Sequence, residues 1–103
     1  MRGEREAAAE IRRLFRTDAC RGRQFAGSAD SPDIVTSIEG VHFEVKRAEL
    51  LRLYDALQQA SGDAGNRIPV VLRRQNSRPW VAIVRLHDLP ELAVQLYLTL
   101  AES

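Results

Sequence analysis

Apolar residues recur at helical spacing in three stretches of the chain. Residues three or four positions apart lie on one face of a helix, so each stretch predicts an amphipathic helix. The first stretch covers residues 2–15, and its apolar face consists of Ala7, Ile11, Leu14 and Phe15. The second covers residues 49–63, with the apolar residues Leu50, Leu53, Tyr54, Leu57 and Ala60. The third runs from residue 88 onward, with the apolar residues Leu89, Leu92, Ala93, Leu96 and Leu100. The glycine-containing segment 62–66 is expected to end the middle helix.

Between these helices the apolar residues form short runs or alternate with polar residues, which is the pattern of strands. The stretches with this pattern are residues 19–25, 33–37, 41–46, 68–72 and 80–84. Glu39-Gly40 supplies a turn between the second and the third, and residues 26–31 and 73–78 are predicted as loops. The order helix, three strands, helix, two strands, helix predicts an α/β fold, and 103 residues fit a single domain over residues 1–103.

The composition narrows the class of protein. One cysteine cannot form an internal disulfide, which indicates a reducing compartment, and no signal sequence or run of about 20 apolar residues indicates export or a membrane. The two histidines and the cysteine are too widely spaced for a zinc finger. The net charge of +1 excludes a purely electrostatic nucleic-acid binder, and the expectation is a small soluble intracellular domain.

Candidate chemistry lies on the strand over residues 41–46, where the odd positions are apolar and the even positions are His42, Glu44 and Lys46. Because the apolar face of a strand packs on the core, Glu44 and Lys46 are expected to project together from the opposite face. A hairpin turn just before this strand would set Asp33 across from Glu44 or Lys46, on the same face. Two carboxylates and an ammonium group then converge.

This combination suits phosphate chemistry. Magnesium prefers carboxylate ligands together with substrate phosphate, and a lysine beside them can orient or deprotonate the attacking water. Lys46 is the single lysine among fifteen basic residues, and a compact ammonium differs chemically from a guanidinium. The alternative is a cross-strand salt bridge on a solvated face. Glu4 continues the buried stripe of the first helix, so its carboxylate could approach Asp33 and Glu44. The alternative is that its charge stabilises the first turn of the helix by complementing the helix dipole.

The motif Pro32-Asp33 followed by Glu44-Val45-Lys46 resembles the PD-(D/E)XK nuclease motif. Glu4-Arg5-Glu6 ahead of an amphipathic helix is similar to the opening motif of the archaeal-type Holliday junction resolvases, a family of that superfamily. Three further segments match in the same order, namely Ala26-Gly27-Ser28, Ile68-Pro69-Val70 and Trp80. The resemblance implies a restriction-endonuclease-like αβββαββα fold with a central mixed five-stranded sheet flanked by helices. Small relatives occur in bacteriophages. The resemblance therefore implies that the protein acts in the cytoplasm of a prokaryotic or phage-infected cell.

The resemblance also implies an activity, that of a Mg²⁺-dependent endodeoxyribonuclease. Such an enzyme resolves four-way (Holliday) DNA junctions by paired nicks from a homodimer. By position, the ligands of Mg²⁺ or Mn²⁺ would be Asp33, Glu44, the backbone carbonyl of Val45 and Glu4. Lys46 would act on the nucleophilic water.

Contacts to DNA are assigned to residues around this site. The resemblance implies that Arg5 contacts phosphate and that Ser28 lies on the loop before the first acid. In that loop the family carries a functional arginine where this chain has Gln24, so the role is assigned to the neighbouring Arg23. The basic residues that flank the site add Arg21, Arg47, Arg73, Arg74 and Arg78. Phosphate contacts read the shape of DNA and not its base sequence, which suits recognition of a junction.

The predicted helices carry more apolar surface than one face of a sheet needs. The extra residues are Leu51 and Tyr54 in the middle helix and Val94, Tyr97 and Leu98 in the last. An excess of apolar surface on a small domain suggests a partner, and a twofold homodimer would bury it.

Two other functions are compatible with the same residues. One is a nuclease of this fold that acts on flaps, nicks or ordinary duplex, and the other is a non-catalytic DNA-binding module. Two residues near the site are given structural roles: His42 as a hydrogen-bonded strand residue and Trp80 as part of the core.

Overall fold

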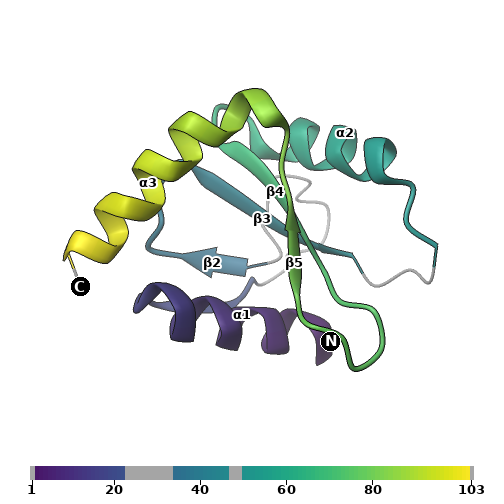
Figure 1. The fold of residues 1–103 in the computed structure, drawn as a ribbon, viewed down its shortest axis with the longest axis horizontal. Coiled ribbons are helices and arrows are strands. Elements are labelled where there is room, and N and C mark those ends of the chain that lie inside the picture. Colours follow the sequence, from purple (N-terminus) through teal and green to yellow (C-terminus); the bar gives the residue numbers. More distant parts are fainter. Residues whose placement is uncertain (1, 23–33, 47–49, 103) are drawn as a thin grey trace.

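The structure, a computed structural model, describes residues 2–22, 34–46 and 50–102. Helices and strands follow one another in the predicted order (Figure 1). They are α1 (Arg2–Phe15), β1 (Ala19–Arg21), β2 (Ile34–Thr36), β3 (Val41–Lys46), α2 (Leu53–Ala64), β4 (Ile68–Arg73), β5 (Val81–Ile83), a short 3₁₀ helix (Leu86–Asp88) and α3 (Leu89–Glu102). Among the described residues, no helix combines the length and the apolar character that a bilayer span requires.

The strands form one mixed five-stranded sheet in the order β1-β2-β3-β4-β5. The pairs β1–β2, β2–β3 and β4–β5 are antiparallel, whereas β3 and β4 are parallel. Two parallel neighbours need a crossover between them, and α2 is that crossover. The predicted α/β class, the αβββαββα order of restriction-endonuclease-like folds and the flanking helices are therefore confirmed.

The two faces of the sheet are covered by different helices (Figure 1). On one face α1 and α3 build the larger core with the residues Ala7, Ala8, Ile11, Ile34, Phe43, Val70, Leu72 and Leu92. On the other face α2 builds a smaller core with the residues Ala56, Leu57, Ala60 and Val71. Removal of this apolar surface from water stabilises the fold on both sides of the sheet. Trp80 is half-buried and packs against the larger core, as predicted.

The middle helix differs from the prediction in both its start and its buried face. It begins at Leu53 and not at residue 49, and Leu50 and Tyr54 are 89% and 83% exposed. The buried residues are Leu57 and three alanines, Ala56, Ala60 and Ala64. Alanines have no large side chain to hold the helix away from the strands, so α2 lies close to the sheet and Ala60 is fully buried. The predicted stripe is therefore correct at Leu57 and Ala60 and wrong at Leu50, Leu53 and Tyr54.

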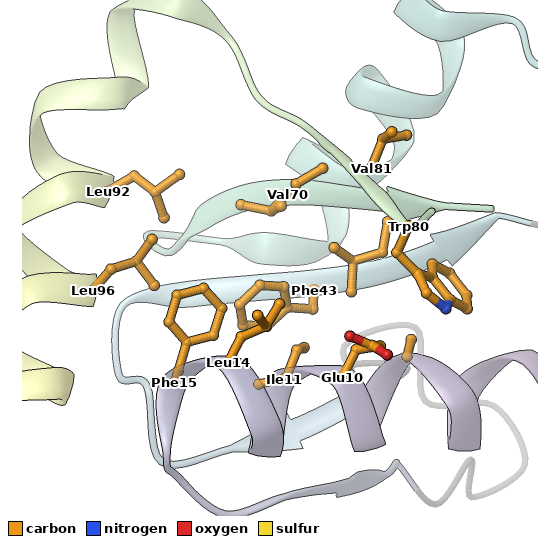
Figure 2. A pocket seen from close by; sticks show the side chains of 13 residues that line it. Glu10, Ile11, Leu14, Phe15, Phe43, Val70, Trp80, Val81, Leu92 and Leu96 are labelled. Atoms are coloured by element: carbon orange, nitrogen blue, oxygen red, sulfur yellow. The ribbon is translucent and has the colours of Figure 1, made fainter. Parts of the chain in front are cut away.

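An apolar cavity of about 150 Å³ lies between α1, the sheet and α3 (Figure 2). Its walls include Ile11 and Phe15 of α1, Phe43 of β3, Val70 of β4 and Leu92 of α3. Figure 2 shows these side chains pointing into the space between the helices and the strands. The space beside Phe43 is open to solvent, because its rim includes the exposed Leu14 and Val81.

Candidate functional site

The third strand places His42, Glu44 and Lys46 on one face of the sheet, as the alternation predicted. That face is not solvated, because α2 covers it. His42 is 1% exposed and Glu44 is 6% exposed. Of the two sequence interpretations, a salt bridge on an open surface is wrong.

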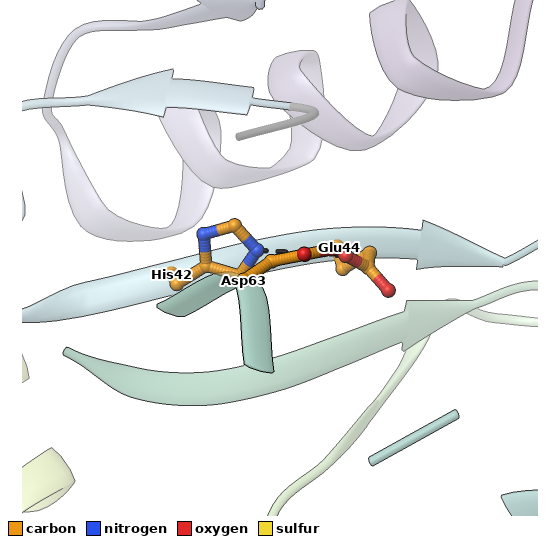
Figure 3. A group of neighbouring side chains, drawn as sticks. All are labelled: His42, Glu44 and Asp63. Carbon is orange, nitrogen blue, oxygen red and sulfur yellow. Dashed lines mark ion pairs between the residues drawn. The ribbon is translucent and has the colours of Figure 1, made fainter. Parts of the chain in front are cut away.

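Helix α2 adds two polar side chains to this face, Gln59 and Asp63. The Lys46 Nζ donates a hydrogen bond of 2.5 Å to Gln59 Oε1, and it lies 3.4 Å from Glu44 Oε2. His42 Nε2 lies 3.5 Å from Glu44 Oε1. One ligand atom from each of His42, Glu44 and Asp63 lies within 4.8 Å of the others (Figure 3). The site is thus built from one strand and the helix that crosses over it.

Two periodicities bring these residues together. Gln59 and Asp63 are one helical turn apart, about 6 Å along α2. Glu44 and Lys46 are two residues apart, about 6.6 Å along β3. Because a crossover helix runs antiparallel to the strands it connects, the earlier helix residue meets the later strand residue. Gln59 therefore meets Lys46, and Asp63 meets Glu44.

Several polar atoms in this buried group lack hydrogen bonds. Neither ring nitrogen of His42 has a hydrogen-bond partner, and neither does Glu44 Oε2. Buried polar groups are nearly always hydrogen-bonded, so these atoms indicate a place where a ligand can bind. The expectation that His42 is a hydrogen-bonded structural residue is wrong, because its ring meets Glu44 only at 3.5 Å.

The polar groups around Glu44 favour its ionised form, Lys46 by its charge and His42 and Asp63 as hydrogen-bonding groups. Burial raises the pKa of the Glu44 carboxyl, but the His42 ring, the Lys46 ammonium and Asp63 together outweigh this effect and lower that pKa below its ordinary value. Glu44 is therefore a carboxylate at neutral pH, and it presents negative charge inside the protein.

The lowered pKa of Glu44 predicts an acid-dependent loss of stability in the metal-free protein. The carboxylate stabilises the fold above the ordinary pKa of 4.5, and this stabilisation is lost as the pH falls through the lower pKa of the folded state. The difference in free energy of unfolding between wild type and Glu44→Gln is therefore expected to be largest near neutral pH and to shrink below about pH 4.5. Urea unfolding in EDTA at several pH values measures it, with the exposed Glu39→Gln as control. A difference that does not change with pH would contradict the prediction.

The other predicted site residues are distributed differently. Asp33, Arg23, Ser28 and Arg47 lie outside the described residues, as does the side chain of Arg21. Glu4 is half-buried on α1, which packs on the opposite face of the sheet, and it does not belong to the group around Glu44. The side chain of Val45 packs against the larger core, which leaves only its backbone carbonyl for the predicted role.

The predicted DNA-binding arginines fall into two places among the described residues. Arg73 lies opposite Lys46 in the register of the parallel strands β3 and β4, so it adds a second positive charge beside the Lys46 ammonium. Arg74 forms an ion pair of 3.3 Å with Glu6 of α1 and donates from Nε to the carbonyl oxygen of Arg78 at 2.8 Å. Arg5 and Arg78 are exposed.

A polar cavity of about 240 Å³ lies beside these arginines, between the first turn of α1 and the β4–β5 loop. Its walls include Glu6, Arg74, Asn76, Ser77 and Trp80. The ion pair between Glu6 and Arg74 therefore holds one wall of this cavity in place.

Sequence reasoning missed Asp63 and Gln59, although the sequence holds a signal for them. Asp63 is seven residues after Ala56 and so lies on the stripe that contains the buried alanines, whereas Gln59, three residues after Ala56, is exposed at the edge of that stripe. A carboxylate on the buried stripe of a crossover helix needs a partner on the strand below it.

Comparison of the chain with protein-family models, with curated proteins and with solved structures finds no match. The likeness to junction resolvases therefore stays a prediction that depends on the motifs of the sequence, and the chemistry of the site has to be argued from its residues.

Proposed function

We propose that this protein is a metal-dependent endodeoxyribonuclease that cuts four-way DNA junctions. The observation that carries the proposal is the ion pair of 3.4 Å between Glu44 and Lys46 on β3, in a sheet of restriction-endonuclease-like order. A carboxylate that can bind a cation and an ammonium that can act on water are thus side by side.

The second carboxylate of the proposed centre is Asp33. The β2–β3 register pairs Ile34 with Phe43. Asp33 precedes Ile34 in the sequence, and Glu44 follows Phe43, so the proposal pairs the two acids across the hairpin. The backbone carbonyl of Val45 is the further ligand, whereas Glu4 lies on α1 at the opposite face of the sheet and is left out of the proposed centre.

A divalent cation fits the residues that are described. The described interaction of the buried Glu44 Oε2 is its ion pair with Lys46, which leaves lone pairs of the carboxylate for a cation. When bound, Mg²⁺ or Mn²⁺ would supply Lewis-acid stabilisation of the charge that develops on the phosphate. The chain's own contribution is Lys46, whose ammonium can orient the attacking water and stabilise the charge on the phosphate. Gln59 holds the Lys46 ammonium in position through its hydrogen bond.

The proposed DNA surface takes in arginines at two places in the fold. Arg73 lies next to Lys46 in the sheet, and Arg5, Arg74 and Arg78 lie toward the start of α1 and the β4–β5 loop. The proposal adds Arg21, Arg23, Ser28 and Arg47 from the sequence. Phosphate contacts of this kind give affinity for the shape of a junction without selecting its base sequence.

A homodimer is part of the proposal because two equivalent sites allow paired cuts. Support comes from α3, where Val94 is 49%, Tyr97 71% and Leu98 48% exposed, and from Tyr54 of α2. Leu51, by contrast, packs against the smaller core and contributes little to such a surface.

The burial of Glu44, at 6% exposure, favours a second candidate function. A carboxylate covered by a helix is less accessible to a DNA phosphate than one in an open cleft. The second candidate is a domain that keeps the fold and binds branched DNA without cutting it.

One assay separates the two candidates. Purified protein is incubated with an end-labelled four-way junction or a matched linear duplex, in Mg²⁺ or in EDTA. Paired cuts at the junction that need metal are the expected result. Equal cutting of duplex would keep the nuclease and remove the junction specificity, whereas tight junction binding without cutting would favour the second candidate.

A further inference from the structure

The group formed by His42, Glu44 and Asp63 has the composition of a transition-metal site. We propose that His42 Nε2 and one carboxylate oxygen each from Glu44 and Asp63 bind one divalent transition-metal ion, of the Mn²⁺ or Zn²⁺ class, in preference to Mg²⁺ or Ca²⁺. Two of these ligands come from β3 and one from α2. Neither His42 nor Asp63 belongs to the proposed nuclease centre, so only Glu44 is shared.

The spacing of the donor atoms is close to that of a metal site. The three atoms lie within 4.8 Å of one another, and His42 Nε2 lies 3.5 Å from Glu44 Oε1. Two ligands that each lie about 2.1 Å from one ion are at most about 4.2 Å apart. Small side-chain rotations are therefore enough to bring all three donors to an ion.

The unused nitrogen of His42 points to a ligand. The ring is 1% exposed, neither of its nitrogens has a hydrogen-bond partner, and Nε2 is the atom that faces Glu44 (Figure 3). A buried imidazole without a partner carries a cost of desolvation that a bound metal ion would remove. Glu44 Oε2 likewise makes no hydrogen bond, although it is ion-paired with Lys46 at 3.4 Å.

The chemistry of the donors decides the class of metal. Imidazole nitrogen is a good ligand for Zn²⁺ and its neighbours, and Mn²⁺ accepts it beside the carboxylates that it prefers, whereas Mg²⁺ and Ca²⁺ favour oxygen donors and bound water. The charges agree with a cation, because Glu44 and Asp63 lie at the His42 end of the group. Lys46 and Arg73 lie at the other end, paired across β3 and β4.

The test is a titration of the full-length protein with Mn²⁺, followed by electron paramagnetic resonance, with Mg²⁺ as competitor. One bound Mn²⁺ per chain is expected, held at least about tenfold more tightly than Mg²⁺. The bound ion should show magnetic coupling to a directly coordinated imidazole nitrogen. Asp63→Asn and His42→Gln should each lower the affinity about tenfold or more, and His42→Gln should abolish the nitrogen coupling.

Two matched controls lie on exposed parts of the same chain. Asp55→Asn changes an exposed acid on the same helix, and His87→Gln changes an exposed histidine, so both should leave Mn²⁺ binding unchanged. Circular dichroism identifies any variant that fails to fold, and Asp63→Asn tests the proposal if His42→Gln does so. Equal affinities for Mn²⁺ and Mg²⁺, or equal binding by the Asp63→Asn and Asp55→Asn variants, would overturn the proposal.

The metal site and the nuclease fail separately. Selective Mn²⁺ binding that depends on Asp63, in a protein that cuts no DNA, would support the metal site and remove the nuclease. DNA cleavage with Mg²⁺, in a protein that shows no preference for a transition metal, would support the nuclease and remove the metal site.

Discussion

Replacement of Glu44 by glutamine is expected to slow cleavage of a four-way junction by at least about a thousandfold while junction binding stays nearly unchanged. Glutamine keeps the size of the side chain but removes the charge that holds a cation next to the phosphate. Lys46→Met is expected to have a similar effect, because it removes the ammonium that acts on water and keeps most of the stem. Single-turnover cleavage of an end-labelled junction measures the rate, and a gel-shift assay in Ca²⁺ measures binding.

The matched control for this prediction is Glu39→Gln, a substitution of the same chemistry at an exposed position just before β3. It should cut at the wild-type rate. If the Glu44→Gln and Lys46→Met variants also cut at that rate, the site lies elsewhere in the chain. If both variants lose binding and cutting together, Glu44 and Lys46 support the structure of the domain, and the result would contradict a catalytic role for them.

Phe43→Ala is expected to destabilise the domain by about 3–5 kcal/mol, the range for removal of a large buried aromatic side chain. Phe43 is 4% exposed and contacts both α1 and the sheet interior. Phe43 lines the pocket of about 150 Å³, so removal of its ring would enlarge that space. A loss of this size is a large part of the free energy of unfolding of a small domain.

Urea unfolding followed by circular dichroism measures this loss. Leu50→Ala is the control, because Leu50 is 89% exposed and its removal should change the stability by less than about 0.5 kcal/mol. A change below about 1 kcal/mol for Phe43→Ala would show that α1 does not pack on this face of the sheet.

The fold could be predicted wherever the pattern of the sequence is strong. The apolar stripe of α1 and the alternation along β3 predicted Arg2–Phe15 and Val41–Lys46 with the bounds that the structure gives. Strand β5 is shorter than predicted, because the ends of strands depend on pairing with neighbours as well as on propensity. The face of α2 could not be chosen correctly from the large side chains, since alanines mark its buried side.

The site could be predicted only in part. Alternation places Glu44 and Lys46 on one face, but it does not say which element covers that face. The covering element follows from the parallel pairing of β3 and β4, which is a property of the whole sheet. Alternation therefore cannot place Asp63 beside Glu44, and a strand histidine among polar neighbours is more often a structural residue than a ligand. Asp33, the first acid of the motif, lies outside the described residues.

The unequal cores on the two faces of the sheet bear on how a substrate would reach Glu44. Among the described residues, the core under α1 and α3 joins twelve buried side chains, whereas the core under α2 joins four, three of them small or β-branched. Local opening of a folded protein costs least where the fewest apolar contacts are broken. Slow amide hydrogen exchange is thus expected in α1 and faster exchange in α2. Partial detachment of α2 would act as a gate that exposes Glu44 and Lys46 without unfolding the rest of the domain.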